Sequence, residues 1–154
     1  MPIRESSDQV QKVEDRSLGF SIYEGTATIS GPLTALSTGY SGSTTISLSD
    51  LNLGVQIPEV SAVLQSAASI GGGVTRVSYQ TLPFTRWNTN GTIEEAAYLE
   101  VYYDYVSSPG TPNASSSFFK IYYFNRTSTS GVSLEYKIKG SDAANSDSAY
   151  RRTQ

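Results

Sequence analysis

The most constraining feature of the chain is a strict alternation of apolar and polar residues in its second half. Between Val132 and Lys139 every second residue is apolar, and the residues in between are serine, glutamate or lysine. A period of two places all the apolar side chains on one face of an extended strand, whereas a helix would scatter them. The same alternation runs through 97–106 and 118–125, so these segments predict strands with one buried and one wet face.

The first half of the chain shows weaker versions of this alternation. These segments are 20–29, 44–50, 59–65 and 74–82. In the last of them, the pattern directs Val77 and Tyr79 inward. Residues 59–70 also fit helical spacing, because apolar residues recur there at intervals of three and four, but the alternation favours a strand.

Turn-forming glycine, proline and serine residues separate these segments, at Gly31-Pro32, at 71–73 and in the loop 107–117. About seven short strands joined by such turns predict an antiparallel β-sandwich, of jelly-roll or immunoglobulin type, over residues 18–140. Residues 141–154 lose the alternation and are expected to form a polar C-terminal tail.

Residues 1–17 differ from the rest and are treated as an N-terminal arm. The segment is rich in charge, and Val10 and Val13, three positions apart, form a helical stripe too short to be stable alone. Two interpretations stay open. The arm is a disordered tail, or it becomes ordered on a neighbouring subunit.

The chain has no cysteine and no histidine, which removes disulfides, thiolate metal sites, cysteine nucleophiles and the commonest general base. Carboxylates remain. Glu94 and Glu95 are expected in a loop, and Glu100 and Asp104 lie about 13 Å apart on one strand face, too far for a retaining glycosidase. No acidic loop with calcium-binding spacing is present. We therefore expect no enzyme, no catalytic residue, no metal and no cofactor.

Charge and hydropathy limit the partners. The chain carries 11 basic and 14 acidic residues, a net charge of −3, which does not favour nucleic acid. No apolar run approaches the roughly 20 residues of a membrane span, and the polar N-terminus lacks a secretory signal. Charged residues make up only 16% of the chain, so charge protects its surface weakly against association. This composition favours a protein that works in an assembly.

Exposed aromatic residues are the best interaction candidates. The alternation places five of them opposite the core-facing set: Tyr98, Tyr102, Phe118, Tyr122 and Phe124. The single tryptophan, Trp87, is expected in a loop. Together with Val10 and Val13 of the arm, these residues are the predicted interface. Aromatic residues with few charges are typical of protein interfaces, and flat rings also stack on sugars.

The chain also resembles the small β-sandwich modules of bacteriophage virion proteins. The similar stretches, over about 60% of the chain, are 46–48, 53–60 with a Leu-Gly corner, 79–85 with a Leu-Pro step, and the closing strand 134–138. The resemblance implies a non-enzymatic component of the virion, such as a capsid decoration, head–tail or tail-appendage protein. It also implies multiple copies on a symmetric particle.

We therefore expect a virion structural protein whose partners are other virion proteins and itself, as a homo-oligomer for which a trimer is one option. The alternative is a carbohydrate-binding module for attachment to a host surface, with Trp87 and Tyr102 stacking on a glycan. A third hypothesis, a glycan hydrolase, would need Glu95 or Asp104 as a catalytic group.

Overall fold

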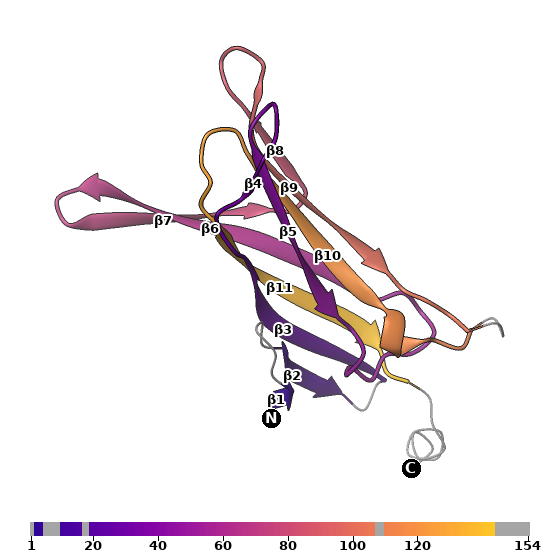
Figure 1. Ribbon diagram of the computed structural model, residues 1–154. Helices are drawn as coiled ribbons and strands as arrows, with labels where there is room; N and C mark the ends of the chain where they lie inside the picture. The colour runs from indigo at the N-terminus through magenta and orange to yellow at the C-terminus, as the bar shows by residue number, and fades with distance from the viewer. Residues whose placement is uncertain (1, 5–9, 17–18, 107–109, 144–154) are drawn as a thin grey trace.

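The computed structural model describes residues 2–4, 10–16, 19–106 and 110–143, and this part of the chain is almost entirely β-structure (Figure 1). The strands are β1 (Pro2–Arg4), β2 (Val10–Arg16), β3 (Phe20–Ile29), β4 (Thr34–Ala35), β5 (Tyr40–Ser47), β6 (Glu59–Gly71), β7 (Val74–Thr81), β8 (Phe84–Trp87), β9 (Ile93–Tyr102), β10 (Phe118–Asn125) and β11 (Val132–Ser141). A short 3₁₀ helix, Ala114–Ser116, precedes β10.

The strands form two antiparallel sheets that pack face to face (Figure 1). The six-stranded sheet has the order β1-β2-β3-β11-β6-β7, and the five-stranded sheet has the order β4-β5-β10-β9-β8. The predicted all-β sandwich is thus confirmed. Strands that are far apart in the sequence pair, β3 with β11 and β5 with β10, whereas β6–β7 and β8–β9 are local hairpins.

The core lies between the sheets and is built from the alternating residues of the central strands. The largest contributors are Tyr23 and Ile29 of β3, Phe119, Ile121 and Tyr123 of β10, and Leu134, Tyr136 and Ile138 of β11. The rings of Phe119 and Tyr136 meet edge to face across the sandwich, with centroids 5.1 Å apart. The alternation that the sequence predicts for β10 and β11 therefore becomes the contact between the two sheets.

The Leu-Gly corner after β5 closes one end of the core. Leu51 and Leu53 are buried, and the hydroxyl of Tyr103 donates a hydrogen bond to the carbonyl oxygen of Gly54. The hydroxyl of Tyr105 donates to the carbonyl oxygen of Val55 at 2.5 Å. These two tyrosines follow β9, so they hold the corner against the end of that strand.

The N-terminal strand β2 extends the chain's own sheet. It pairs with β3, and Val10 lies opposite Gly25 with only 5% of its surface exposed. Residues 10–16 are thus a strand in this structure. Three parts of the predicted arm and tail lie outside the described residues. They are the side chain of Val13, residues 1, 5–9 and 17 of the arm, and residues 144–154 of the tail. Docking of the arm on a neighbouring subunit stays a prediction.

Strand β6 settles the ambiguity between strand and helix at 59–70, because it runs from Glu59 to Gly71 as a strand. The prediction that Val77 and Tyr79 point inward was wrong, since they are 50% and 59% exposed. The reason is the register of the β6–β7 pair, in which Tyr79 lies opposite Gln65 and Val77 opposite Ala67, on the face opposite to that of the buried Leu64. In addition, the pairing of β6 with β11 ends at Leu64, and beyond that point β6 and β7 pair only with each other.

Two further segments expected as loops are strands. Trp87 is the last residue of β8, and Glu94 and Glu95 lie at the start of β9. The cause is the β8–β9 ladder, in which Arg86 lies opposite Glu95 and Trp87 opposite Ile93. Backbone pairing and the ion pair between Arg86 and Glu95 stabilise this hairpin despite its polar sequence.

Candidate functional site

The outer face of the five-stranded sheet carries a row of aromatic side chains. Strands β9 and β10 are neighbours in this sheet, with Tyr98 opposite Tyr122 and Tyr102 opposite Phe118. Residues opposite each other in an antiparallel pair point to the same face, and the residues between them point to the core. We call the outward set, Tyr98, Tyr102, Phe118, Tyr122 and Phe124, the aromatic face.

Four of the five rings of the aromatic face are stacked in two cross-strand pairs. Tyr98 and Tyr122 have centroids 4.6 Å apart with planes inclined by 14°, and Tyr102 and Phe118 have centroids 4.8 Å apart with planes inclined by 25°. Such offset stacking is worth about 0.5–1.5 kcal/mol per pair beyond burial. The stacking holds the rings in place, so the face is a preorganised surface.

The two charged residues of this face are engaged with its aromatic residues. The ammonium group of Lys120 lies 5.0 Å from the ring centroid of Tyr122, and the hydroxyl of Tyr102 donates a 2.5 Å hydrogen bond to Glu100. The bond to Glu100 raises the pKa of Tyr102 above its usual value. Lys120 and Glu100 are themselves opposite each other. The net charge of the face is therefore close to zero.

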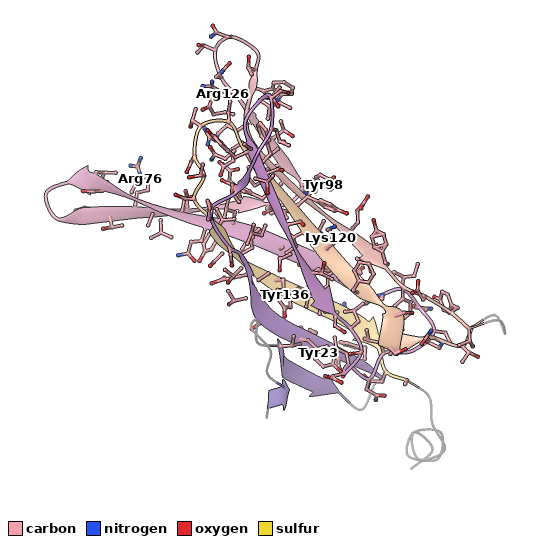
Figure 2. All side chains as sticks on the ribbon, in the orientation of Figure 1. Tyr23, Arg76, Tyr98, Lys120, Arg126 and Tyr136 are labelled. Carbon is pink, nitrogen blue, oxygen red and sulfur yellow. The ribbon has the colours of Figure 1, made fainter. Side chains whose placement is uncertain are left out.

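The aromatic face remains accessible, since its three β10 rings are flanked by small side chains on β5 and its two β9 rings keep more than a third of their surface exposed. On β5, Ser41, Ser43 and Ser47 lie opposite Phe124, Tyr122 and Phe118. Tyr98 keeps 47% of its surface exposed and Tyr102 keeps 36%. Figure 2 shows Tyr98 and Lys120 on this side of the molecule.

A shallow groove of about 680 Å³ borders the aromatic face where β4 meets β5. One wall consists of Tyr98, Tyr122 and Phe124, and the other comes from Pro32 and Leu36 of the segment around β4. Ser41 and Ser43 add hydroxyl groups. Gly42 permits this arrangement, because a Cβ there would lie 2.7 Å from Ile29 and 2.8 Å from Leu33. Apolar walls with a few hydroxyl groups suit a small ligand or an inserted side chain.

The carboxylates at the end of the β8–β9 hairpin are bound to arginines. Glu95 accepts a 2.7 Å hydrogen bond from Arg86 and a 2.6 Å bond from the hydroxyl of Tyr123. Glu94 accepts a 3.0 Å bond from Nε of Arg126, which lowers the pKa of Glu94. Both carboxylates are therefore held in structural ion pairs, and the lowered pKa of Glu94 is the opposite of the raised pKa that a general acid needs.

Of the eight interface candidates, five come together on the aromatic face. Trp87 lies apart from this face. It is opposite Ile93 at the start of β9, whereas Tyr102 is at the end of β9, roughly 30 Å from Ile93 at 3.3 Å per residue. The two residues that were expected to stack on a glycan therefore lie far apart on the sheet. Val10 packs into its own core instead of a free surface.

Sequence reasoning missed the groove wall and the projecting half of the β6–β7 hairpin. Residues 65–79, which we call the hairpin arm, are all exposed and extend away from the sandwich (Figure 1). Four large apolar residues of the arm are about half exposed: Ile70, Val74, Val77 and Tyr79. The signal in the sequence was the near absence of charge around the three glycines 71–73, since Arg76 is the arm's one charged residue.

No protein-family model matches the chain, and neither a curated protein nor a solved structure matches it. Within the residues that the structure describes, no helix is long and apolar enough to cross a membrane. Over the same residues, no group of three or more carboxylates is placed to hold a metal ion.

Proposed function

We propose that the protein is a non-enzymatic structural component of a bacteriophage virion that is incorporated by docking its aromatic face on another virion protein. The observation that carries this proposal is the stacked, accessible and nearly uncharged aromatic face on a rigid sheet. Aromatic residues are enriched in interface cores, and charged residues are depleted there. The resemblance of the sequence to virion β-sandwich modules supplies the biological setting.

The mechanism is burial of a preformed surface. Stacked side chains lose little rotamer freedom on binding, so less entropy opposes docking than for mobile side chains. As a partner covers the face, Glu100 can keep its hydrogen bond from Tyr102, and Lys120 can keep its contact with the ring of Tyr122. These contacts limit the free-energy cost of removing the two charges from water. The groove beside Tyr98 offers a pocket for a protruding side chain of the partner.

Particle incorporation tests the proposal. Particles purified from cells that make the wild-type chain are expected to contain it in a fixed ratio to the major virion protein. The double variant Tyr98→Ser/Tyr122→Ser should fold, shown by an unchanged circular dichroism spectrum, and be absent from particles. Glu135→Ser, on the exposed outer face of the six-stranded sheet, should be incorporated normally. Absence of the wild-type chain from particles would contradict the proposal.

A carbohydrate-binding module is the second candidate, and the groove is the observation that favours it. Tyr98 and Tyr122 present ring surface beside the hydroxyl groups of Ser41 and Ser43, which is a suitable lining for a sugar ring. In this candidate function the proposed glycan site is at Tyr98 rather than at Trp87 and Tyr102. Binding on a glycan array that is lost in Tyr98→Ala and retained in Trp87→Ala would support it.

A further inference from the structure

The hairpin arm is a two-stranded ribbon with both edges unpaired. On one side, β7 is the edge strand of the six-stranded sheet. On the other side, the pairing of β6 with β11 ends at Leu64, so residues 65–71 have no neighbour there among the described strands. The arm is about 20 Å long at 3.3 Å per residue from Gln65 to Gly71.

An isolated two-stranded ribbon is at best marginally stable in water, and stability requires a third strand or a packed face. Natural proteins protect exposed edge strands with charges, prolines or bulges. Over residues 65–79 the arm has no proline and one charged residue, Arg76. Its one irregularity in pairing lies at the tip, between Ser69 and Gly71. Strand β7 is therefore an unprotected edge that is ready to accept another strand.

We propose that the occupant of this edge is β7 of a second copy of the chain, paired antiparallel about a two-fold axis at Ser78. This inference does not depend on the virion role. In an antiparallel two-fold pair one residue lies opposite its own copy, and its neighbours pair symmetrically. With Ser78 at the axis, residues 75–81 of the two copies are all paired.

The side chains favour this register. Val77 of each copy lies opposite Tyr79 of the other, a β-branched residue beside an aromatic one, and this pair occurs twice. Thr75 then lies opposite Thr81, and both kinds of pair stabilise antiparallel sheets. A two-fold axis at Arg76 would instead place two guanidinium groups opposite each other. In the chosen register Arg76 faces Gln80, so no like charges meet.

The pairing also explains the length of the arm. The ribbon becomes four-stranded, in the order β6-β7-β7-β6, and each tip reaches the base of the other arm. Val77 and Tyr79 share their face with Ala67 and Gln65 of the same ribbon, so in the dimer the half-exposed Val77 and Tyr79 side chains of the two copies become neighbours between these flanking residues. Two-fold closure uses up both β7 edges, which prevents open-ended growth of the sheet.

Cysteine cross-linking tests both the contact and the register, because the chain has no cysteine of its own. The purified full chain should be a dimer by light scattering. Under mild oxidation, Ser78→Cys should give a disulfide-linked dimer, since directly opposite residues have Cα atoms about 4.5–5.5 Å apart. Ser66→Cys is the matched control. Ser66 lies opposite Ser78 within one arm, but its two copies would be three strands apart, about 14 Å, and should not cross-link.

A charge variant tests the same contact without cross-linking. Ser78→Lys puts two ammonium groups at the axis and should raise the dimer dissociation constant about tenfold, whereas Ser66→Lys should leave it nearly unchanged. Tyr98→Ser/Tyr122→Ser should remain dimeric, which separates this contact from the aromatic face. A monomeric wild-type chain, equal cross-linking by Ser66→Cys, or a dissociation constant that Ser78→Lys leaves unchanged would overturn the inference.

Discussion

The hydroxyl of Tyr123 donates a 2.6 Å hydrogen bond to Oε2 of Glu95, whose other oxygen accepts a bond from Arg86 at 2.7 Å. Tyr123 is only 4% exposed. Burial first, and then the bond to Glu95, raise the pKa of Tyr123 to about 12. One buried tyrosine thus ties β10 to the β8–β9 hairpin and should make the stability of this end of the sandwich depend on pH.

The first prediction concerns Tyr123→Phe. Because the folded pKa lies above the ordinary value of 10.0, this tyrosine's contribution to stability is complete below pH 10 and is lost as the pH rises toward 12. At pH 7, Tyr123→Phe should lower the free energy of unfolding by about 1 kcal/mol, the value of one hydrogen bond. The deficit should shrink between pH 10 and pH 12, as measured by urea denaturation. A deficit that stays constant across this range would contradict the assignment.

The second prediction concerns the stacked pair Tyr98 and Tyr122. A double-mutant cycle with Tyr98→Ala and Tyr122→Ala should give a coupling free energy of about 1 kcal/mol. The cycle is measured by chemical denaturation of the four proteins. Tyr98 and Phe118 are not opposite each other in the β9–β10 register, so a control cycle between them should show a clearly smaller coupling. Equal couplings in the two cycles would mean that the face is not organised in pairs.

The third prediction concerns Gly131, which touches the turn after β3. A Cβ at this position would collide with the carbonyl oxygen of Ile29 and would lie 2.6 Å from the nitrogen of Gly31. These are backbone atoms that cannot move aside easily. Gly131→Ala should therefore cost about 3 kcal/mol of unfolding free energy, at the upper end of what overpacking costs. The exposed neighbour Ser130→Ala is the control and should change stability by less than about 0.5 kcal/mol.

The parts of the fold that the sequence predicted are those in which local pattern and tertiary environment agree. Strand β10 runs over Phe118–Asn125 as expected, because both of its edges are paired and one of its faces packs on the core. The aromatic face follows from the same alternation. Periodicity tells which side chains share a face, and in β9 and β10 that was enough to assemble the set.

The hairpin arm could not be predicted because alternation reveals neither which face of a strand is turned to the core nor whether a second layer covers that face. Strand β6 has 13 residues, and its pairing with β11 stops about halfway along it. Val77 and Tyr79 carry the pattern of a half-buried strand although no part of the described chain buries them. Likewise, the sequence around Glu94 and Glu95 predicts a polar loop. Their place in a strand is explained by two ion pairs that the sequence does not reveal, with Arg86 of β8 and with Arg126, which follows β10.

The last prediction separates the arm from the stability of the sandwich. Ser66 and Ser78 are opposite residues, so replacing 67–77 by Asn-Gly joins them through a two-residue hairpin turn. Every residue removed is exposed, and no core side chain is lost. The shortened chain should therefore keep the free energy of unfolding of a wild-type monomer within about 0.5 kcal/mol.

The comparison must be made with monomer, because dimerisation itself adds to apparent stability by mass action. Ser78→Lys, in which the arm is intact but pairing is opposed, supplies that monomeric reference when it is measured at a protein concentration below its raised dissociation constant. The shortened chain and Ser78→Lys should unfold at the same urea concentration, and both should lack the concentration dependence of the wild-type transition. If the shortened chain unfolds at a clearly lower urea concentration than Ser78→Lys, the arm contributes to the stability of a single copy. Its exposed apolar residues would then already have a packing role within that copy.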